Sequence, residues 1–113
     1  MRIDEMQGMV HELAVKKGWW DHVNEELTTD MILSKLALIH SEVSEAVEAV
    51  RDGKLEPWRD ENGKPEGMAI ELADAVIRIA DLCQRLGLDL QDAIETKHDY
   101  NKGRAYRHGG RKA

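Results

Sequence analysis

The chain of 113 residues has no phenylalanine, only two prolines and a single cysteine, Cys83. One cysteine excludes an internal disulfide, and its place among apolar residues is typical of a small buried side chain. No apolar run is long enough to cross a membrane. The first residues carry acids where a secretion signal needs a basic start. We therefore expect a cytoplasmic, helix-rich protein that makes no membrane contact.

Basic charge is scarce over most of the chain and concentrated at its end. Residues 1–96 hold 10 basic and 21 acidic side chains, a net charge of −11, whereas residues 97–113 hold six and one, a net charge of +5. A cationic end could bind nucleic acid or a membrane surface, or fold back to neutralise phosphates. The acidic body argues against a broad surface for a nucleic-acid polymer.

Apolar periodicity and helix-end signals predict one domain over residues 1–113 with four helices. Thr28, Thr29 or Asp30 supplies the N-cap of the second helix, Asp89 that of the fourth, and Gly87 closes the third. Both prolines fall in the connection before the third helix, which we expect to be a loop. The expected architecture is an all-α four-helix bundle, with helices over about 3–17, from the cap to about 51, over 66–86 and over 90–103, then an irregular basic tail from about 104.

Two pairs of acids stand three positions apart, Glu42 and Glu45 in the second helix and Glu71 and Asp74 in the third. Residues at this spacing share a helix face, so each pair can bind one hard cation through oxygen. A lone pair is more simply a solvated face. Here, however, the first acid of each pair lies roughly 80° from the centre of its apolar stripe, and the second roughly 60° further in the same sense.

This matched offset predicts an all-oxygen metal site. Packing one stripe against the other would bring both acidic pairs to one edge of the helix interface. The apolar stripes are Leu36, Ile39, Val43, Val47 and Val50 in the second helix, and Met68, Leu72, Ala75, Val76, Ile79, Cys83 and Leu86 in the third.

The fourth helix carries a candidate phosphate site. Lys97, Asn101 and Arg104 lie at positions i, i+4 and i+7, so two cations and an amide share one face. Such a face suits phosphate oxygens, although a solvated basic face is the simpler alternative.

Three of the five aromatic residues are tryptophans, and none falls within a predicted core stripe. Trp20, next to Trp19 in the loop after the first helix, and Trp58 are candidates for stacking a nucleotide base, an interaction worth about 1–3 kcal/mol where it occurs. The alternative is that the tryptophans cover the ends of the bundle or a subunit interface.

Two further charged residues lie on the third helix. Asp81 either extends the acidic stripe as a metal ligand or faces solvent. Arg78 follows Asp74 by four residues, the spacing of an ordinary ion pair within one helix.

The chain resembles the MazG-like, all-α nucleoside triphosphate pyrophosphohydrolases. The resemblance covers LSKLALIHSEVSEAVEAVR, then ELADAVIRIADLC, then KHDYNKGRAYRHGG. It implies that Mg²⁺, with Mn²⁺ as a possible substitute, is held by the metal and catalytic residues Glu42, Glu45, Glu71 and Asp74. It also implies that Lys97, Asn101 and Arg104 contact the phosphates of a nucleoside triphosphate, which is hydrolysed to a monophosphate and pyrophosphate, in a homodimer or a dimer of dimers.

The sequence departs from that family at one position. Many relatives have a Glu-Glu doublet at the start of the first motif, whereas here Ser41 precedes Glu42. This departure leaves open which carboxylate, if any, orients the attacking water.

Two other classes of function remain open. Glu95 and His98 have the spacing used in carboxylate-bridged di-metal redox bundles, but those sites need a second such motif, which the chain lacks. A non-catalytic helical adaptor would have solvated acidic pairs and would use its tryptophans as an interface.

Overall fold

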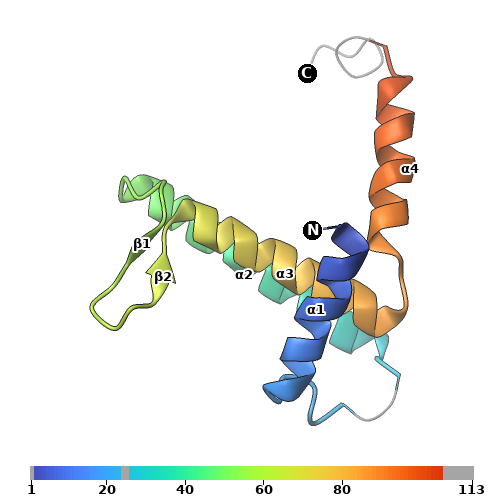
Figure 1. Cartoon of the computed structure of the whole chain (residues 1–113), viewed down its shortest axis with the longest axis horizontal. Helices are drawn as coiled ribbons and strands as arrows, with labels where there is room; N and C mark the ends of the chain where they lie inside the picture. Colours follow the sequence, from blue (N-terminus) through green and yellow to red (C-terminus); the bar gives the residue numbers. More distant parts are fainter. Residues whose placement is uncertain (1, 24–25, 106–113) are drawn as a thin grey trace.

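The computed structural model describes residues 2–23 and 26–105, and it is mostly helical (Figure 1). Its four helices confirm the predicted all-α class, and their ends lie within two residues of the predicted ones. The basic tail, predicted from about residue 104, lies outside the described residues from residue 106 onward. The helices are α1 (Ile3–Lys16), α2 (Thr29–Arg51), α3 (Met68–Leu86) and α4 (Leu90–Lys102).

The helix-end signals act as predicted. Thr28 Oγ1 accepts a hydrogen bond from the backbone N–H of Met31 at 3.2 Å, and an Asp89 oxygen accepts one from that of Asp92 at 3.0 Å. Gly87 follows α3 in the left-handed conformation, with φ of 73°. The next N–H, that of Leu88, then donates back to the carbonyl of Cys83 at 2.9 Å, which satisfies an otherwise free carbonyl of the last turn.

The connection before α3, predicted as a loop, contains a short antiparallel hairpin of β1 (Trp58–Arg59) and β2 (Pro65–Glu66). Its turn is held by Asp60, whose side chain accepts hydrogen bonds from the N–H groups of Asn62 and Lys64 at 2.8 and 2.9 Å. A two-residue strand has too little periodicity to be recognised in a sequence.

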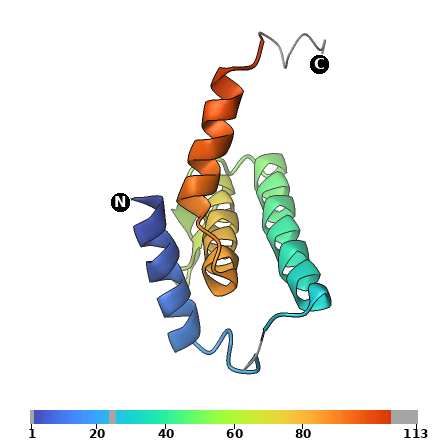
Figure 2. The same cartoon turned by 90° about the vertical axis from the view of Figure 1, so that its right-hand side faces the viewer.

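Helix α3 lies between α1 and α2, whereas α4 projects away from these three helices (Figures 1 and 2). The predicted four-helix bundle is therefore not formed within the described part of the single chain. The radius of gyration is 16.8 Å, larger than the roughly 13 Å expected for a compact domain of this length.

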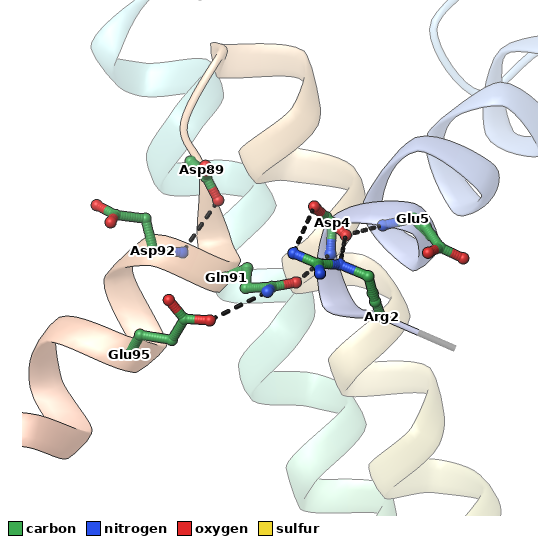
Figure 3. A network of polar contacts seen from close by, with 7 residues as sticks. All are labelled: Arg2, Asp4, Glu5, Asp89, Gln91, Asp92 and Glu95. Atoms are coloured by element: carbon green, nitrogen blue, oxygen red, sulfur yellow. Dashed lines mark hydrogen bonds and ion pairs between the residues drawn. The ribbon is translucent and has the colours of Figure 1, made fainter.

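Among the described residues, hydrogen bonds join the first residues of α4 and the turn before it to α1. The buried side chain of Gln7 donates to the carbonyl of Leu88 at 2.6 Å and accepts from the N–H of Leu90 at 3.1 Å. Gln91 accepts a hydrogen bond from the backbone N–H of Asp4 at 3.1 Å (Figure 3). No described residue of α4 is buried, so most of this helix lacks a packing partner within one chain.

The small core lies where α1, α3 and the loop after α1 meet, and it contains Ala14, Trp20 and Leu82. The predicted packing of one apolar stripe against the other is not complete in the single chain. Most of the stripe on α2 stays exposed, whereas in the stripe on α3 Ala75 is buried and only Leu72 and Val76 are exposed. Helices α2 and α3 are in contact, and each has a buried alanine, Ala46 on α2 and Ala75 on α3. The exposed apolar residues of the two stripes are Leu36, Val43, Val47 and Val50 on α2, and Leu72 and Val76 on α3.

Candidate metal centre

The beginning of α3 is docked closely against the segment that follows α2. The N–H of Met68 donates to the carbonyl of Lys54 at 2.9 Å, and that of Ala69 donates to the carbonyl of Leu55 at 3.3 Å. Gly67, the N-cap, has φ of 113°, and a Cβ there would lie 2.5 Å from the carbonyl oxygen of Glu56. A glycine is thus required at this close approach, which sets α3 in position beside α2.

Three carboxylates meet between these two helices. Glu42 and Glu45 extend from α2 and Glu71 from the first turn of α3, and each offers an oxygen within 4.8 Å of the others. The predicted convergence of the two acidic pairs is therefore present for these three residues. Asp74, the fourth predicted ligand, lies next to Glu42, whose negative charge affects its titration.

The crowding of negative charge changes the titration of both acids on α3. Burial first, then a hydrogen bond and the negative charge of Glu45, raises the pKa of Glu71 to about 7. Burial first, then the charge of Glu42, also raises the pKa of Asp74, an effect partly offset by Arg78. Without a cation, the carboxyl groups of Glu71 and Asp74 therefore retain their protons more strongly than isolated carboxyl groups do.

Glu42 is the most buried member of the cluster, with 6% of its surface exposed. Its Oε1 accepts a hydrogen bond from Nε of Arg78 on α3 at 2.9 Å. Its Oε2 is buried and has no hydrogen-bond partner in the part of the chain that the structure describes. The ion pair of Arg78 thus runs between helices to Glu42, whereas the sequence spacing suggested a pair with Asp74 within α3.

A hollow of about 300 Å³ adjoins the cluster and is lined on one side by Glu45 and Glu71. The β1–β2 hairpin forms the other side and contributes Trp58 and Lys64. The Trp58 side chain is half exposed, so the stacking candidate on the hairpin lies beside the carboxylates. The lining residues are Glu45, Glu48, Ala49, Asp52, Lys54, Trp58, Lys64, Glu66, Gly67 and Glu71.

Trp20, the other stacking candidate, belongs to the core, with 6% of its surface exposed. Its indole Nε1 donates to Asp81 at 3.1 Å, and the ammonium of Lys35 lies 4.4 Å from its ring centroid. The prediction of an open stacking surface is therefore wrong for this residue. A loop tryptophan looks exposed in the sequence because its burial depends on helices distant along the chain.

Asp81 is neither a ligand of the carboxylate cluster nor exposed to solvent, so both predictions for it are wrong. It is buried, and besides Trp20 it contacts Nδ1 of His11 on α1 at 2.7 Å. A buried carboxylate needs such partners. Asp81 consequently joins α1, the loop after α1 and α3.

The predicted phosphate-binding residues Lys97, Asn101 and Arg104 do lie together, and with Ala105 they line a shallow hollow on α4. Because α4 projects away from α2 and α3 (Figures 1 and 2), this face does not meet the carboxylate cluster within one chain. The two predicted halves of the site are therefore separated in the monomer.

The chemistry of the cluster fits a hard divalent cation. Carboxylate oxygens suit Mg²⁺, Ca²⁺ and Mn²⁺ alike, so the donor set does not select one of them. The buried Oε2 of Glu42 lacks a partner that such a cation would provide.

Comparison with models of protein families found no match, and neither did comparisons with curated proteins and with solved structures. Among the described residues, no helix combines the length and the apolar character needed to cross a membrane.

Sequence reasoning missed two contributors to the site. The partner of Arg78 across the helix interface depends on the rotation of α2 relative to α3, which no local pattern specifies. Lys64 stands in a connection whose hairpin was not predicted, although the sequence Asn62-Gly63 before it is a turn signal.

Proposed function

We propose that the chain is a metal-dependent nucleoside triphosphate pyrophosphohydrolase of the MazG-like type. The observation that carries the proposal is the buried, unpartnered Oε2 of Glu42, in a carboxylate cluster with Glu45 and Glu71. An unsatisfied buried acceptor costs about 1–3 kcal/mol or more if charged, and a divalent cation is the partner that this cluster suits. The substrate class rests on the order and spacing of the MazG-like motifs.

In this proposal Glu42, Glu45, Glu71 and Asp74 hold Mg²⁺ or Mn²⁺. The cation, when bound, neutralises phosphate oxygens and makes a water molecule more acidic. Trp58, at the hollow beside the cluster, offers its ring to the base. By the resemblance, water attacks the α-phosphorus of NTP or dNTP, the bond to the bridging oxygen breaks, and (d)NMP and pyrophosphate are released.

A second copy of the chain is part of the proposal. In this proposal the exposed apolar residues of the antiparallel helices α2 and α3 (Figure 1) form one apolar side of the pair, to which Val43 and Val47 on α2 and Val76 on α3 belong. The same pair of helices from a partner would cover this side and complete a four-helix bundle. A homodimer or dimer of dimers would also allow Lys97, Asn101 and Arg104 of one copy to contact the phosphates of a nucleotide bound at the carboxylates of another copy.

The test is release of pyrophosphate from a panel of ribo- and deoxynucleoside triphosphates, with Mg²⁺ and with a chelator. We expect metal-dependent formation of monophosphate and pyrophosphate. Replacing Asp74 with alanine should abolish turnover, because it removes a carboxylate from the cluster, while circular dichroism stays helical. The matched control is Asp99→Ala, which removes an exposed acid that pairs with Lys102 on α4.

Normal turnover by folded Asp74→Ala protein would show that the site is assigned wrongly. No turnover across the panel by the folded parent protein would instead favour the adaptor. The exposed apolar residues of α2 and α3 are the observation in favour of that second candidate, and it predicts a melting temperature that divalent metal leaves unchanged. A di-metal redox centre predicts a visible or paramagnetic signal after loading with iron or manganese.

A further inference from the structure

Arg78 is a permanent cation in contact with the carboxylate cluster. Its Nε binds Oε1 of Glu42 at 2.9 Å, and the two side chains are 30% and 8% exposed. Its guanidinium carbon also lies 5.7 Å from the ring centroid of Trp19, in the loop after α1. An arginine fixed by a buried carboxylate and an aromatic ring has little freedom to move away from the site.

The two oxygens of Glu42 differ in their hydrogen bonding. Oε1 accepts the hydrogen bond from Arg78, whereas Oε2 is buried and has no hydrogen-bond partner among the described residues. One oxygen of Glu42 lies within 4.8 Å of oxygens of Glu45 and Glu71. This arrangement disfavours the use of both oxygens of Glu42 on one ion and leaves Oε2 as the oxygen without a hydrogen-bond partner. The guanidinium also adds one positive charge next to the carboxylates.

A carboxylate cluster without a countercharge would bind a bare divalent cation tightly, because affinity in all-oxygen sites grows with the number of ligand charges. A fixed positive charge in the same partly buried region repels that cation. The same charge attracts an anionic polyphosphate, for which arginine is a preferred partner. Arg78 therefore acts in opposite directions on the two components of a metal–polyphosphate complex.

We infer that Arg78 is a positioning residue that holds Glu42 as a one-oxygen ligand and weakens the binding of a bare divalent cation, so that the cation is taken up together with a polyphosphate. This inference rests on the metal site of the proposed function. Its test needs neither turnover nor a nucleotide, so failure of the hydrolase assay does not decide it.

The experiment is titration of the metal-free protein with Mn²⁺ alone, followed by electron paramagnetic resonance of the free ion. In Arg78→Gln the charge is lost but the amide can still donate a hydrogen bond to Glu42. We expect this variant to bind Mn²⁺ at least tenfold more tightly than the parent protein. Arg78→Lys keeps the charge and should stay within about threefold of the parent.

Arg2→Gln is the matched control for charge removal. Arg2 pairs with Asp4 in an exposed network at the start of α1 (Figure 3), and its loss should leave Mn²⁺ affinity unchanged. The double variant Glu42→Gln, Arg78→Gln leaves no unpaired charge at the buried position. It should bind Mn²⁺ more weakly than Arg78→Gln alone, because a ligand carboxylate is missing.

A second readout separates this role from a purely structural one. With inorganic tripolyphosphate present, Arg78→Gln should lose Mn²⁺-dependent polyphosphate binding, whereas Arg78→Lys should recover most of it. Loss of a structural contact would weaken both kinds of binding together. Equal or weaker binding of bare Mn²⁺ by folded Arg78→Gln overturns the inference, and absence of Mn²⁺ binding by every protein overturns both the inference and the proposed metal site.

Discussion

At the scale of single residues, the site is governed by carboxylates that are close together and partly removed from water. Glu71 stands in the first turn of α3, where the helix dipole favours a negative charge. Its pKa is nevertheless raised to about 7, because burial and the neighbouring Glu45 oppose ionisation more strongly. A cation would reverse this balance, since it stabilises the ionised form of every ligand.

The raised pKa predicts that the metal-free protein loses stability as the pH rises. The carboxyl of Glu71 titrates near pH 7 in the folded chain and near its ordinary 4.5 in the unfolded chain. The folded state thus binds more protons over this interval, and the free energy of unfolding falls through it. We expect the melting temperature in chelator to drop by a few degrees between pH 5 and 8, a modest effect because the carboxyl is partly in water and screened.

The measurement is a series of circular dichroism melts of the parent protein and of Glu71→Gln. The variant cannot ionise at this position and should lack this part of the slope. Glu48→Gln, which removes an exposed acid paired with Arg51 on α2, serves as control and should keep it. Identical slopes in the parent and Glu71→Gln would contradict the prediction, and saturating Mg²⁺ should flatten the slope of the parent.

At the scale of elements, the connection between α2 and α3 determines the position of α3 along the axis of α2, and therefore which acidic residues lie opposite each other. Carbonyl groups of residues 54 and 55 accept hydrogen bonds from the first N–H groups of α3. They thereby take the place of the side-chain N-cap that Gly67 cannot provide. The start of a helix that carries a candidate metal ligand is in this way held by backbone contacts alone.

This contact predicts a large effect of Gly67→Ala. The new Cβ would lie 2.5 Å from the carbonyl oxygen of Glu56, in addition to the strain of a φ of 113°. We expect a loss of about 3 kcal/mol or more in the free energy of unfolding and weaker metal binding, because Glu71 shifts with the start of α3. Denaturant unfolding and Mn²⁺ titration would measure the two effects.

Gly63→Ala is the matched control for this substitution. Gly63 in the hairpin turn also has a positive φ, 79°, but a Cβ there meets no atom within 4 Å. It should lose only the backbone term, about 1 kcal/mol, and keep its metal affinity. Equal losses in the two variants would show that the close approach at residue 67 is unimportant.

At the scale of the whole molecule, α1, α3 and α2 form a single layer from which α4 projects (Figure 2). A stable domain normally buries its apolar faces between at least two layers. Here no large side chain among the described residues is fully buried, and Leu36, Val43, Val47 and Val50 on α2 and Leu72 and Val76 on α3 stay exposed. The chain therefore lacks the second layer that its own apolar residues require.

We predict that the protein in solution has a mass at least twice the 12.8 kDa of one chain. Replacing Val43 and Val47 together with glutamate should yield monomers with a lower melting temperature, because two charges would be buried in the partner interface. Size-exclusion chromatography with light scattering measures the mass. Ser44→Glu, which adds a charge at an exposed polar position of α2, should leave the mass unchanged, and a monomeric parent protein would contradict the prediction.

Local signals were sufficient for the helices and their ends. The caps Thr28 and Asp89 and the terminator Gly87 act on groups a few residues away, so their effect can be read from short segments. The acidic pairs could likewise be recognised in the sequence, because their spacing on a helix and their offset from an apolar stripe are local properties. The convergence of Glu42, Glu45 and Glu71 depended in addition on how α2 and α3 are rotated against each other.

Contacts between distant segments were decided by the tertiary structure. The burial of Trp20, the partners of Asp81 and the pairing of Arg78 with Glu42 all depend on how α1, α2 and α3 are rotated and placed. The exposure of apolar residues on α2 and α3 also depends on this placement, because periodicity identifies an apolar face but not the segment that packs against it. Helix periodicity is set by neighbours along the chain, whereas these contacts are set by packing among residues far apart in it.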